Sequence, residues 1–273
     1  MSKIKFSVCN EMFEGWELVE VFLYAAELGY DGVEIAPFTL ADSVEEIAPE
    51  RRREIRRAAE EAGVEIVGLH WLLVSPKGLY INHPDDAVRQ KTQEVILALI
   101  EFCGDLGGKV MIVGSPKQRD VLEGETYRAT WERTLDVFRA CLPAAERRGV
   151  TLCLEPLDGA QTNFITDTAE ALKMVEEIAH PNFQTMVDVR SASFGERETV
   201  AEVIRRVKDH LRHFHANDAN SLGPGFGEVD YAPIADALKE IGYEGYVSVE
   251  VFDFAPGPKE IASRSLEYLR RFF

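Results

Sequence analysis

Short apolar runs alternate with segments of helical periodicity along the whole chain. The apolar runs have the length and composition of strands: IKFSVCN, DGVEIAP, VEIVGLHW, KVMIVGS, VTLCLEP, FQTMVDV, LRHFHAND and YVSVEVF. After the first run, one helix face is marked by the spacing of Leu18, Val21, Phe22, Ala25 and Leu28, and a glycine follows. The pattern predicts eight strands, each followed by a helix.

The other predicted helices have the same form. They are PERRREIRRAAEEAG, a segment near 84–107, the segment with Trp131, Leu135, Phe138 and Leu142, DTAEALKMVEEI with Asp167 as N-cap, a segment near 198–209, YAPIADALKEIG and PKEIASRSLEYLRRFF. Eight such units close most simply into a (β/α)8 TIM barrel, so we expect an α/β fold with a single domain over residues 1–273. A doubly wound open sheet is the alternative, but no glycine-rich phosphate turn follows the first strand.

Charged residues end several of the predicted strands. Active sites of TIM barrels gather at the carboxyl ends of the strands, and alternation along a strand tells which side chains face inward. In VTLCLEP, Glu155 shares a face with Cys153, whereas Leu152 and Leu154 face the helices. The same alternation places further polar side chains on inward faces: Glu34, His70, Asp188, His213, His215 and Glu250. His213 lies deeper than His215, which favours a buried hydrogen-bonding role for it.

Four of these side chains come from neighbouring strands. Glu155, Asp188, His215 and Glu250 end the fifth to eighth strands, which lie side by side in a closed barrel. Carboxylates crowded there would repel one another and take up protons unless a cation lay between them. The sequence therefore predicts a divalent metal site. Three oxygen ligands and one imidazole suit Mn²⁺, Mg²⁺ or Co²⁺ better than a structural Zn²⁺ site, although Zn²⁺ and Fe²⁺ stay open.

Composition favours a small molecule as the ligand. The formal net charge is −17, and nucleic acid and anionic membranes both need a basic face. No apolar run approaches the about 20 residues of a membrane span, and MSKIKFSVCN lacks the apolar core of a signal peptide. The four cysteines stand singly in apolar segments, which indicates reduced core thiols. We expect a cytoplasmic protein without nucleic-acid or membrane partners.

The chain also resembles a known family in three segments: LCLEPLDGAQTNF, MVDV and HFHANDAN…GPGFGEVDYAPIADALKEIGYEGYVSVEVF. They resemble the signatures of the sugar phosphate isomerase/epimerase family, the xylose isomerase-like TIM barrels, which include the ketose 3-epimerases. The likeness covers essentially the whole chain and is most specific over 150–252. It implies one divalent ion, commonly Mn²⁺, on Glu155, Asp188, His215 and Glu250, with the two glutamates acting as acid and base on opposite faces of a sugar. It also implies a homo-oligomer, because relatives are often dimers or tetramers.

The chain departs from the ketose 3-epimerases where they hold the sugar. Those enzymes carry Glu, His and Arg at the positions of Gln161, Ser191 and Ser221. We therefore expect a related reaction on a different substrate, with Arg190 as a replacement anchor.

Further residues are candidates for substrate contact. Trp71 could stack on a sugar, and His70 could contact it or be hydrogen-bonded within the barrel wall. In the loop after the fourth strand, Lys117 and Arg119 could bind a carboxylate or phosphate or stay solvated. Asn217 and Asp218 are expected to shape the loop after the seventh strand or to orient His215, and Glu34 is expected to lie behind the metal ligands.

These residues predict a metal-dependent sugar or sugar phosphate isomerase or epimerase. Glu155 would remove the proton next to a carbonyl, the metal would stabilise the negative enediolate, and Glu250 would return a proton on the other face. A lyase or dehydratase acting on a keto sugar or polyol derivative is the alternative, and a noncatalytic binding barrel is a third class. A DNA endonuclease of this architecture would need about three zinc ions and more than the six histidines present.

Overall fold

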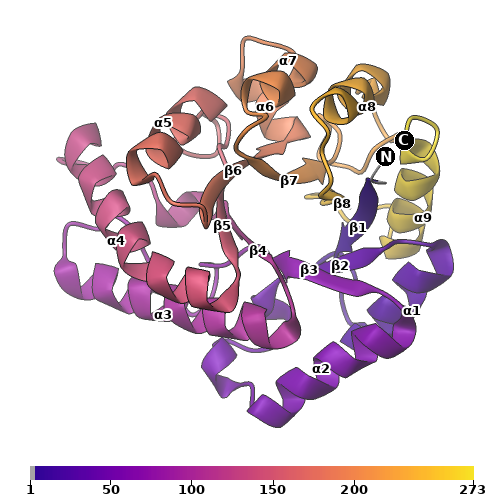
Figure 1. The fold of residues 1–273 in the computed structure, drawn as a ribbon, viewed down its shortest axis with the longest axis horizontal. Helices are drawn as coiled ribbons and strands as arrows, with labels where there is room; N and C mark the ends of the chain where they lie inside the picture. Colours follow the sequence, from indigo (N-terminus) through magenta and orange to yellow (C-terminus); the bar gives the residue numbers. More distant parts are fainter. Residues whose placement is uncertain (1–3) are drawn as a thin grey trace.

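Eight parallel strands close into a barrel in the computed structural model, which describes residues 4–273 (Figure 1). The strands are β1 (Lys5–Cys9), β2 (Gly32–Ile35), β3 (Glu65–Leu69), β4 (Val110–Val113), β5 (Thr151–Leu154), β6 (Phe183–Asp188), β7 (Leu211–Ala216) and β8 (Tyr246–Val249). They follow one another around the barrel in chain order, and β8 pairs with β1 to close it. The predicted TIM barrel is confirmed.

Helices surround the barrel (Figure 1). They are α1 (Leu18–Leu28), α2 (Pro49–Ala62), α3 (Asp86–Leu106), α4 (Tyr127–Arg148), α5 (Thr168–Ile178), α6 (Val189–Gly195), α7 (Val200–Arg206), α8 (Tyr231–Glu240) and α9 (Pro258–Leu269), with short 3-10 turns at η1 (Pro37–Thr39), η2 (Val44–Glu46) and η3 (Pro116–Gln118). Asp167 caps α5 as predicted, because its side chain accepts from the backbone N–H of Glu170.

Helix α6 was not predicted from the sequence. Its seven residues are too few to show a helical period, and it begins directly at the end of β6. Asp188 is its N-cap, and Oδ1 accepts from the backbone N–H of Ser191 at 2.7 Å. One residue thus ends a strand, starts a helix and faces the mouth of the barrel.

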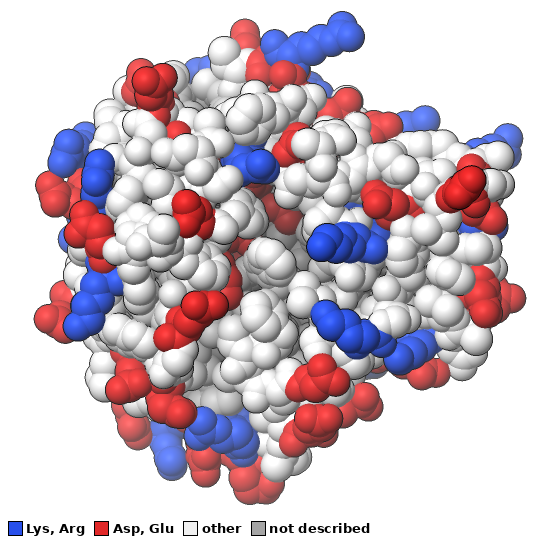
Figure 2. Space-filling view, turned by 180° about the vertical axis from the view of Figure 1, so that it is seen from behind, with Lys and Arg blue, Asp and Glu red and all other residues white. Residues whose placement is uncertain are grey.

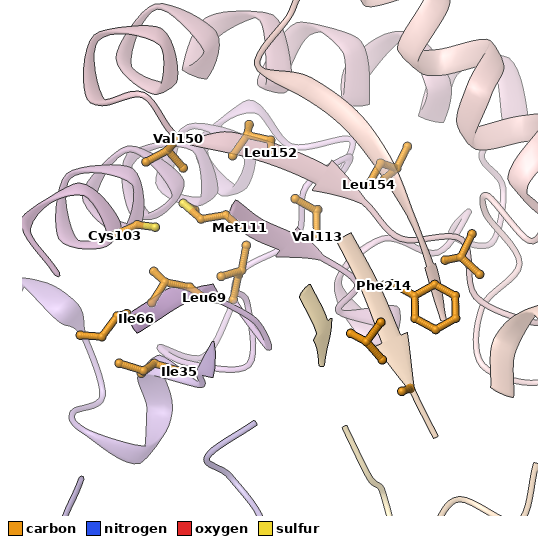
Figure 3. Close-up of a cluster of buried hydrophobic side chains, with 14 of the residues drawn as sticks. Ile35, Ile66, Leu69, Cys103, Met111, Val113, Val150, Leu152, Leu154 and Phe214 are labelled. Carbon is orange, nitrogen blue, oxygen red and sulfur yellow. The ribbon is translucent and has the colours of Figure 1, made fainter. Parts of the chain in front are cut away.

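Alternation along the strands sorts their side chains into two layers. Outward-facing residues pack against the helices, as Figure 3 shows for Ile35, Leu69, Met111, Val113, Leu152 and Leu154. Ile112, Cys153 and Met186 form a separate cluster inside the barrel. Each fully buried aliphatic side chain stabilises the fold by roughly 1.5–3 kcal/mol. Because the outer layer supplies most of this burial, the inner faces of the strands can carry polar side chains toward the mouth.

Acidic and basic side chains are interspersed over the face seen in Figure 2, and acidic ones are visible within the hollow near its centre. Across residues 4–273, none of the helices combines the length and the apolar character needed to cross a membrane.

Candidate metal centre

Glu155, Asp188, His215 and Glu250 meet at the carboxyl ends of β5, β6, β7 and β8. One ligand atom of each lies within 4.8 Å of those of the other three, and all four residues are buried. His215 Nδ1 is 2.9 Å from Glu250 Oε2 and 3.6 Å from Glu155 Oε1. The structure thus brings together the four side chains that alternation had placed on neighbouring inner faces.

The carboxylates of this group perturb one another. Burial, together with the charges of Glu155 and Glu250, raises the pKa of Asp188 to about 7. Burial is also the main cause that raises the pKa of Glu155, and the charge of Glu250 adds to it. Burial alone would lower the pKa of His215, but the carboxylates of Glu250 and Glu34 outweigh it and raise that pKa well above its ordinary value. The group therefore favours bound positive charge, either protons or a cation.

The donor atoms fit a divalent cation. His215 Nδ1 and Glu250 Oε2 are buried, and neither makes a hydrogen bond of acceptable geometry despite lying 2.9 Å apart. Such orphaned buried atoms are rare unless a ligand satisfies them. Gly114 leaves room for the neighbouring carboxylate, because a Cβ at that position would lie 1.6 Å from Glu155 Oε2. Carboxylate oxygens with one imidazole are ligands that Mn²⁺ and related ions accept.

Glu34 on β2 fixes the orientation of two imidazoles inside the barrel. Its Oε2 lies 2.8 Å from His213 Nε2, and its Oε1 lies 3.2 Å from His215 Nε2. Burial would raise the pKa of Glu34, but the two histidines lower it well below its ordinary value. An ionised Glu34 keeps a proton on Nε2 of His215, which leaves Nδ1 to face the carboxylates. The buried hydrogen-bonding role expected for His213 is present.

Asn217 and Asp218 have different contacts. Asn217 Nδ2 donates to Asp188 Oδ2 at 2.5 Å, and its Oδ1 accepts from the backbone N–H of Arg190 at 2.8 Å. Asn217 therefore orients Asp188 rather than His215. Asp218 accepts from the backbone N–H groups of Gly227 and Val229, at 3.2 and 3.3 Å, and so shapes the loop after β7.

Arg190 joins the three positions where the chain departs from the ketose 3-epimerase pattern. Its Nη1 is 3.1 Å from Asp158 Oδ2, and its Nε donates to Ser221 Oγ at 3.1 Å. Gln161 Nε2 donates to the same Asp158 oxygen at 2.7 Å and to Ser191 Oγ at 3.1 Å. These five residues form one polar network, which we call the Arg190 network.

A small hollow of about 80 Å³ opens onto the carboxylates, and six of the residues that line it are His70, Trp71, Glu155, Gln161, Glu250 and Phe252. Trp71 has a φ of 53°, and its Nε1 donates to Glu250 Oε1 at 3.0 Å. His70 Nε2 lies 2.6 Å from Glu11 Oε2. Burial would lower the pKa of His70, but Glu11 raises it to about 9. His70 is thus both hydrogen-bonded within the wall and part of the hollow's lining.

Both alternatives expected for Arg119, contact with substrate and a solvated side chain, are wrong. Only 4% of Arg119 is exposed, and its guanidinium donates to the backbone carbonyls of Glu155 at 2.7 Å and Ile165 at 3.3 Å. Burial lowers its pKa to about 10. It holds together the loops after β4 and β5. Lys117 in η3 is exposed and does not line the hollow, which fits the solvated alternative.

Sequence reasoning missed two acidic residues, Glu11 and Asp158. Glu11 follows the end of β1 by two residues and binds His70, and Asp158 follows the end of β5 by four and binds Arg190. Both lie two or more residues beyond the last regular residue of the strand, where strand alternation no longer predicts direction. An acidic residue soon after a barrel strand was the available signal.

Known proteins resemble this chain over most of its length. D-psicose 3-epimerase of Ruminiclostridium cellulolyticum is 26% identical over 83% of this chain and 75% of the relative. The 3-dehydro-D-guloside 4-epimerase of Escherichia coli is 25% identical over 98% of this chain and 99% of the relative. A solved structure of D-psicose 3-epimerase with D-tagatose from Clostridium cellulolyticum H10 superposes with a TM-score of 0.86 at 21% identity, covering 98% of this chain and 99% of that one. The family model described as xylose isomerase-like TIM barrel matches residues 22–272, and the chain belongs to that family.

Proposed function

We propose that this protein is a divalent-metal-dependent sugar epimerase that inverts a carbon next to a carbonyl. The observation that carries the proposal is the buried group of Glu155, Asp188, His215 and Glu250, with two ligand atoms that lack hydrogen bonds. The named relatives support the sugar class, because they are a psicose 3-epimerase and a 3-dehydroguloside 4-epimerase. In both names the inverted carbon adjoins the carbonyl carbon.

The proposed ligands are Glu155, Asp188, His215 and Glu250. When bound, a divalent ion, Mn²⁺ before Mg²⁺, Co²⁺ or Zn²⁺, would supply positive charge that stabilises negative charge developing on the sugar oxygens. Glu155 and Glu250 line the same hollow from strands that are not neighbours. One carboxylate can therefore take the proton from the carbon, and the other carboxyl can return a proton from a different direction, which inverts the centre.

The remaining residues position the sugar and the carboxylates of the protein that act on it. Trp71 donates to Glu250 and so restrains one of the two proposed proton-transfer groups. The Arg190 network offers donors beside the hollow, and its cation is already paired with Asp158. A paired cation favours hydroxyl groups over a free anion as the ligand. This arrangement supports an uncharged carbohydrate as the substrate.

Proton exchange tests the proposal. The protein is stripped with a chelator, reloaded with each metal, and incubated in D₂O with D-fructose, D-psicose, D-tagatose, sugar phosphates and keto-glycosides, with products followed by NMR. Deuterium at an inverted carbon supports the epimerase, and loss of water or an aglycone would instead identify a lyase. Glu155→Gln should abolish exchange, whereas Glu65→Gln, at an exposed carboxylate on β3, should not. Turnover that survives both chelation and Glu155→Gln would refute the proposal.

A further inference from the structure

A second hollow lies beside the first, and Trp71 lines both. The second has a volume of about 600 Å³, compared with about 80 Å³ for the hollow over the carboxylates. Sites for small molecules typically measure about 300–1,000 Å³, so the volume of the smaller hollow falls below this range and that of the larger hollow falls within it. A ligand held at Glu155 and Glu250 that extends past the indole of Trp71 would enter the larger hollow.

Aromatic side chains form much of the wall of the larger hollow: Phe13, Trp16, Phe38, Trp71 and Phe254. Phe38 is 39% exposed, and its ring centroid lies 6.1 Å from that of Trp71. An exposed ring of this size beside a candidate active site offers a flat face on which a ligand ring can stack. The wall therefore suits a cyclic group with apolar faces.

Glu11 supplies a polar group in the same hollow. It is 5% exposed, its Oε2 contacts His70 at 2.6 Å, and its Oε1 has no hydrogen-bond partner. A buried acceptor without a donor is costly, and a hydroxyl of a ligand would satisfy it. Besides the aromatic wall, the unpaired oxygen of Glu11 thus indicates that the hollow binds a molecule able to donate a hydrogen bond.

Charge narrows the choice of ligand. Glu14 and Glu17 also line the hollow, and among the described lining residues Arg51 is the only cation. Arg51 already contacts Glu54 at 3.3 Å. A phosphate or carboxylate would meet uncompensated negative charge. The Nζ of Lys259 already lies over Trp16, 5.6 Å from the ring centroid. It occupies an aromatic face that would otherwise attract a cationic ligand.

We propose that the larger hollow is a subsite for a second, uncharged sugar ring, so that the substrate is a glycosylated keto sugar rather than a free or phosphorylated one. The inference rests on the proposed function. The reacting carbons would lie at Glu155 and Glu250, the chain of the substrate would pass Trp71, and the second ring would stack on Phe38 with a hydroxyl donating to Glu11.

Calorimetric titration of the Mn²⁺-loaded protein tests this subsite with three probes. Isomaltulose is a fructose unit that carries a glucosyl ring on its far end, and D-fructose and D-fructose 6-phosphate lack that ring. Isomaltulose should bind about tenfold more tightly than D-fructose, and the phosphate ester should bind most weakly. Turnover of D-fructose is measured in parallel by NMR.

Two variants locate the binding. Phe38→Ala removes the stacking face, and Leu40→Trp fills the hollow that Leu40 lines. Each variant should raise the Kd for isomaltulose by about five- to tenfold and leave the Kd for D-fructose within about twofold of the parent value. Leu23→Ala, at a residue of α1 that is 56% exposed and outside the hollow, is the matched control and should change neither.

The outcomes separate the two proposals. If D-fructose is turned over but isomaltulose binds no better, or the variants weaken both sugars equally, the subsite is refuted and the proposed function stands. Tighter binding of the phosphate ester also refutes the subsite. If no keto sugar is bound or turned over, the proposed function fails and the subsite fails with it.

Discussion

At the scale of single residues, Glu34 determines which nitrogen of His215 is free. It contacts His215 Nε2 at 3.2 Å and His213 Nε2 at 2.8 Å, and its pKa is held well below the ordinary value by the two imidazoles, against the effect of burial. Glu34→Gln keeps the shape but removes the charge that fixes the tautomer. We expect the Kd for Mn²⁺ to rise about 10–100-fold, as for other residues that orient metal-binding histidines.

Competition with a fluorescent chelator measures this change, and circular dichroism checks that the variant stays folded. Glu65→Gln is the control, because its carboxylate is 61% exposed and pairs with Lys5. Equal Mn²⁺ affinities in Glu34→Gln and the parent protein would show that Glu34 does not orient His215.

Arg190 is the second residue whose role can be tested singly. Its Nε donates to Ser221 and its Nη1 to Asp158, which a lysine cannot do at once. Arg190→Lys should therefore raise KM for the sugar by about tenfold and leave the Kd for Mn²⁺ within about twofold, because the guanidinium acts on substrate position. Steady-state kinetics and the chelator assay give both values. A loss of Mn²⁺ affinity as large as the change in KM would assign Arg190 to the metal centre instead.

The sequence predicted the direction of side chains well within strands and poorly beyond them. Asp188 in β6 and His215 in β7 lie where period-two alternation places them, since a pleated strand leaves each residue only two directions. Glu155 and Glu250 continue this alternation one residue beyond β5 and β8. Arg119 was misplaced because its long side chain is buried and reaches backbone carbonyls of the segment after β5. The partnership of Glu11 with His70 joins residues 59 positions apart, and no local pattern predicts such a contact.

At the scale of elements, the closeness of β3 and β4 depends on Gly68. A Cβ at this position would lie 2.0 Å from the carbonyl oxygen of Val110, the partner residue in β4. Only two residue pairs define the register of these strands, Gly68 with Val110 and Leu69 with Met111. Gly68→Ala should push the strands apart and lower the free energy of unfolding by about 2–3 kcal/mol.

Urea unfolding followed by circular dichroism measures the loss. Gly159→Ala is the matched control, since a Cβ there would meet no atom within 4 Å, and its effect should stay within about 0.5 kcal/mol. Equal stabilities of the two variants would mean that the strand pair can shift without cost. The apolar pattern predicted both strands, but it carries no information about how closely their backbones approach.

At the scale of the whole molecule, the candidate metal centre ties stability to pH. Burial and the charges of Glu155 and Glu250 raise the pKa of Asp188 from the ordinary 3.8 to about 7. Glu250 and Glu34 raise the pKa of His215 well above 6.5, against the effect of burial. Both groups have a higher pKa in the folded chain than in the unfolded chain, so the folded chain holds their protons more tightly. Their contribution to stability is therefore present at low pH and is lost as the pH rises through the pKa values of the folded chain.

The stability of the metal-free protein should therefore fall as the pH rises from 5 to 8. Each extra proton that the folded state holds changes the free energy of unfolding by about 1.4 kcal/mol per pH unit, which corresponds to a few degrees in Tm. Scanning calorimetry after chelation measures the trend, and Asp188→Asn should flatten it. Added Mn²⁺ should raise Tm more at pH 8 than at pH 5, because the ion displaces protons from the same oxygens. A Tm that rises with pH without metal would contradict this account, since the carboxylates would then be stabilised as charged groups by the protein alone.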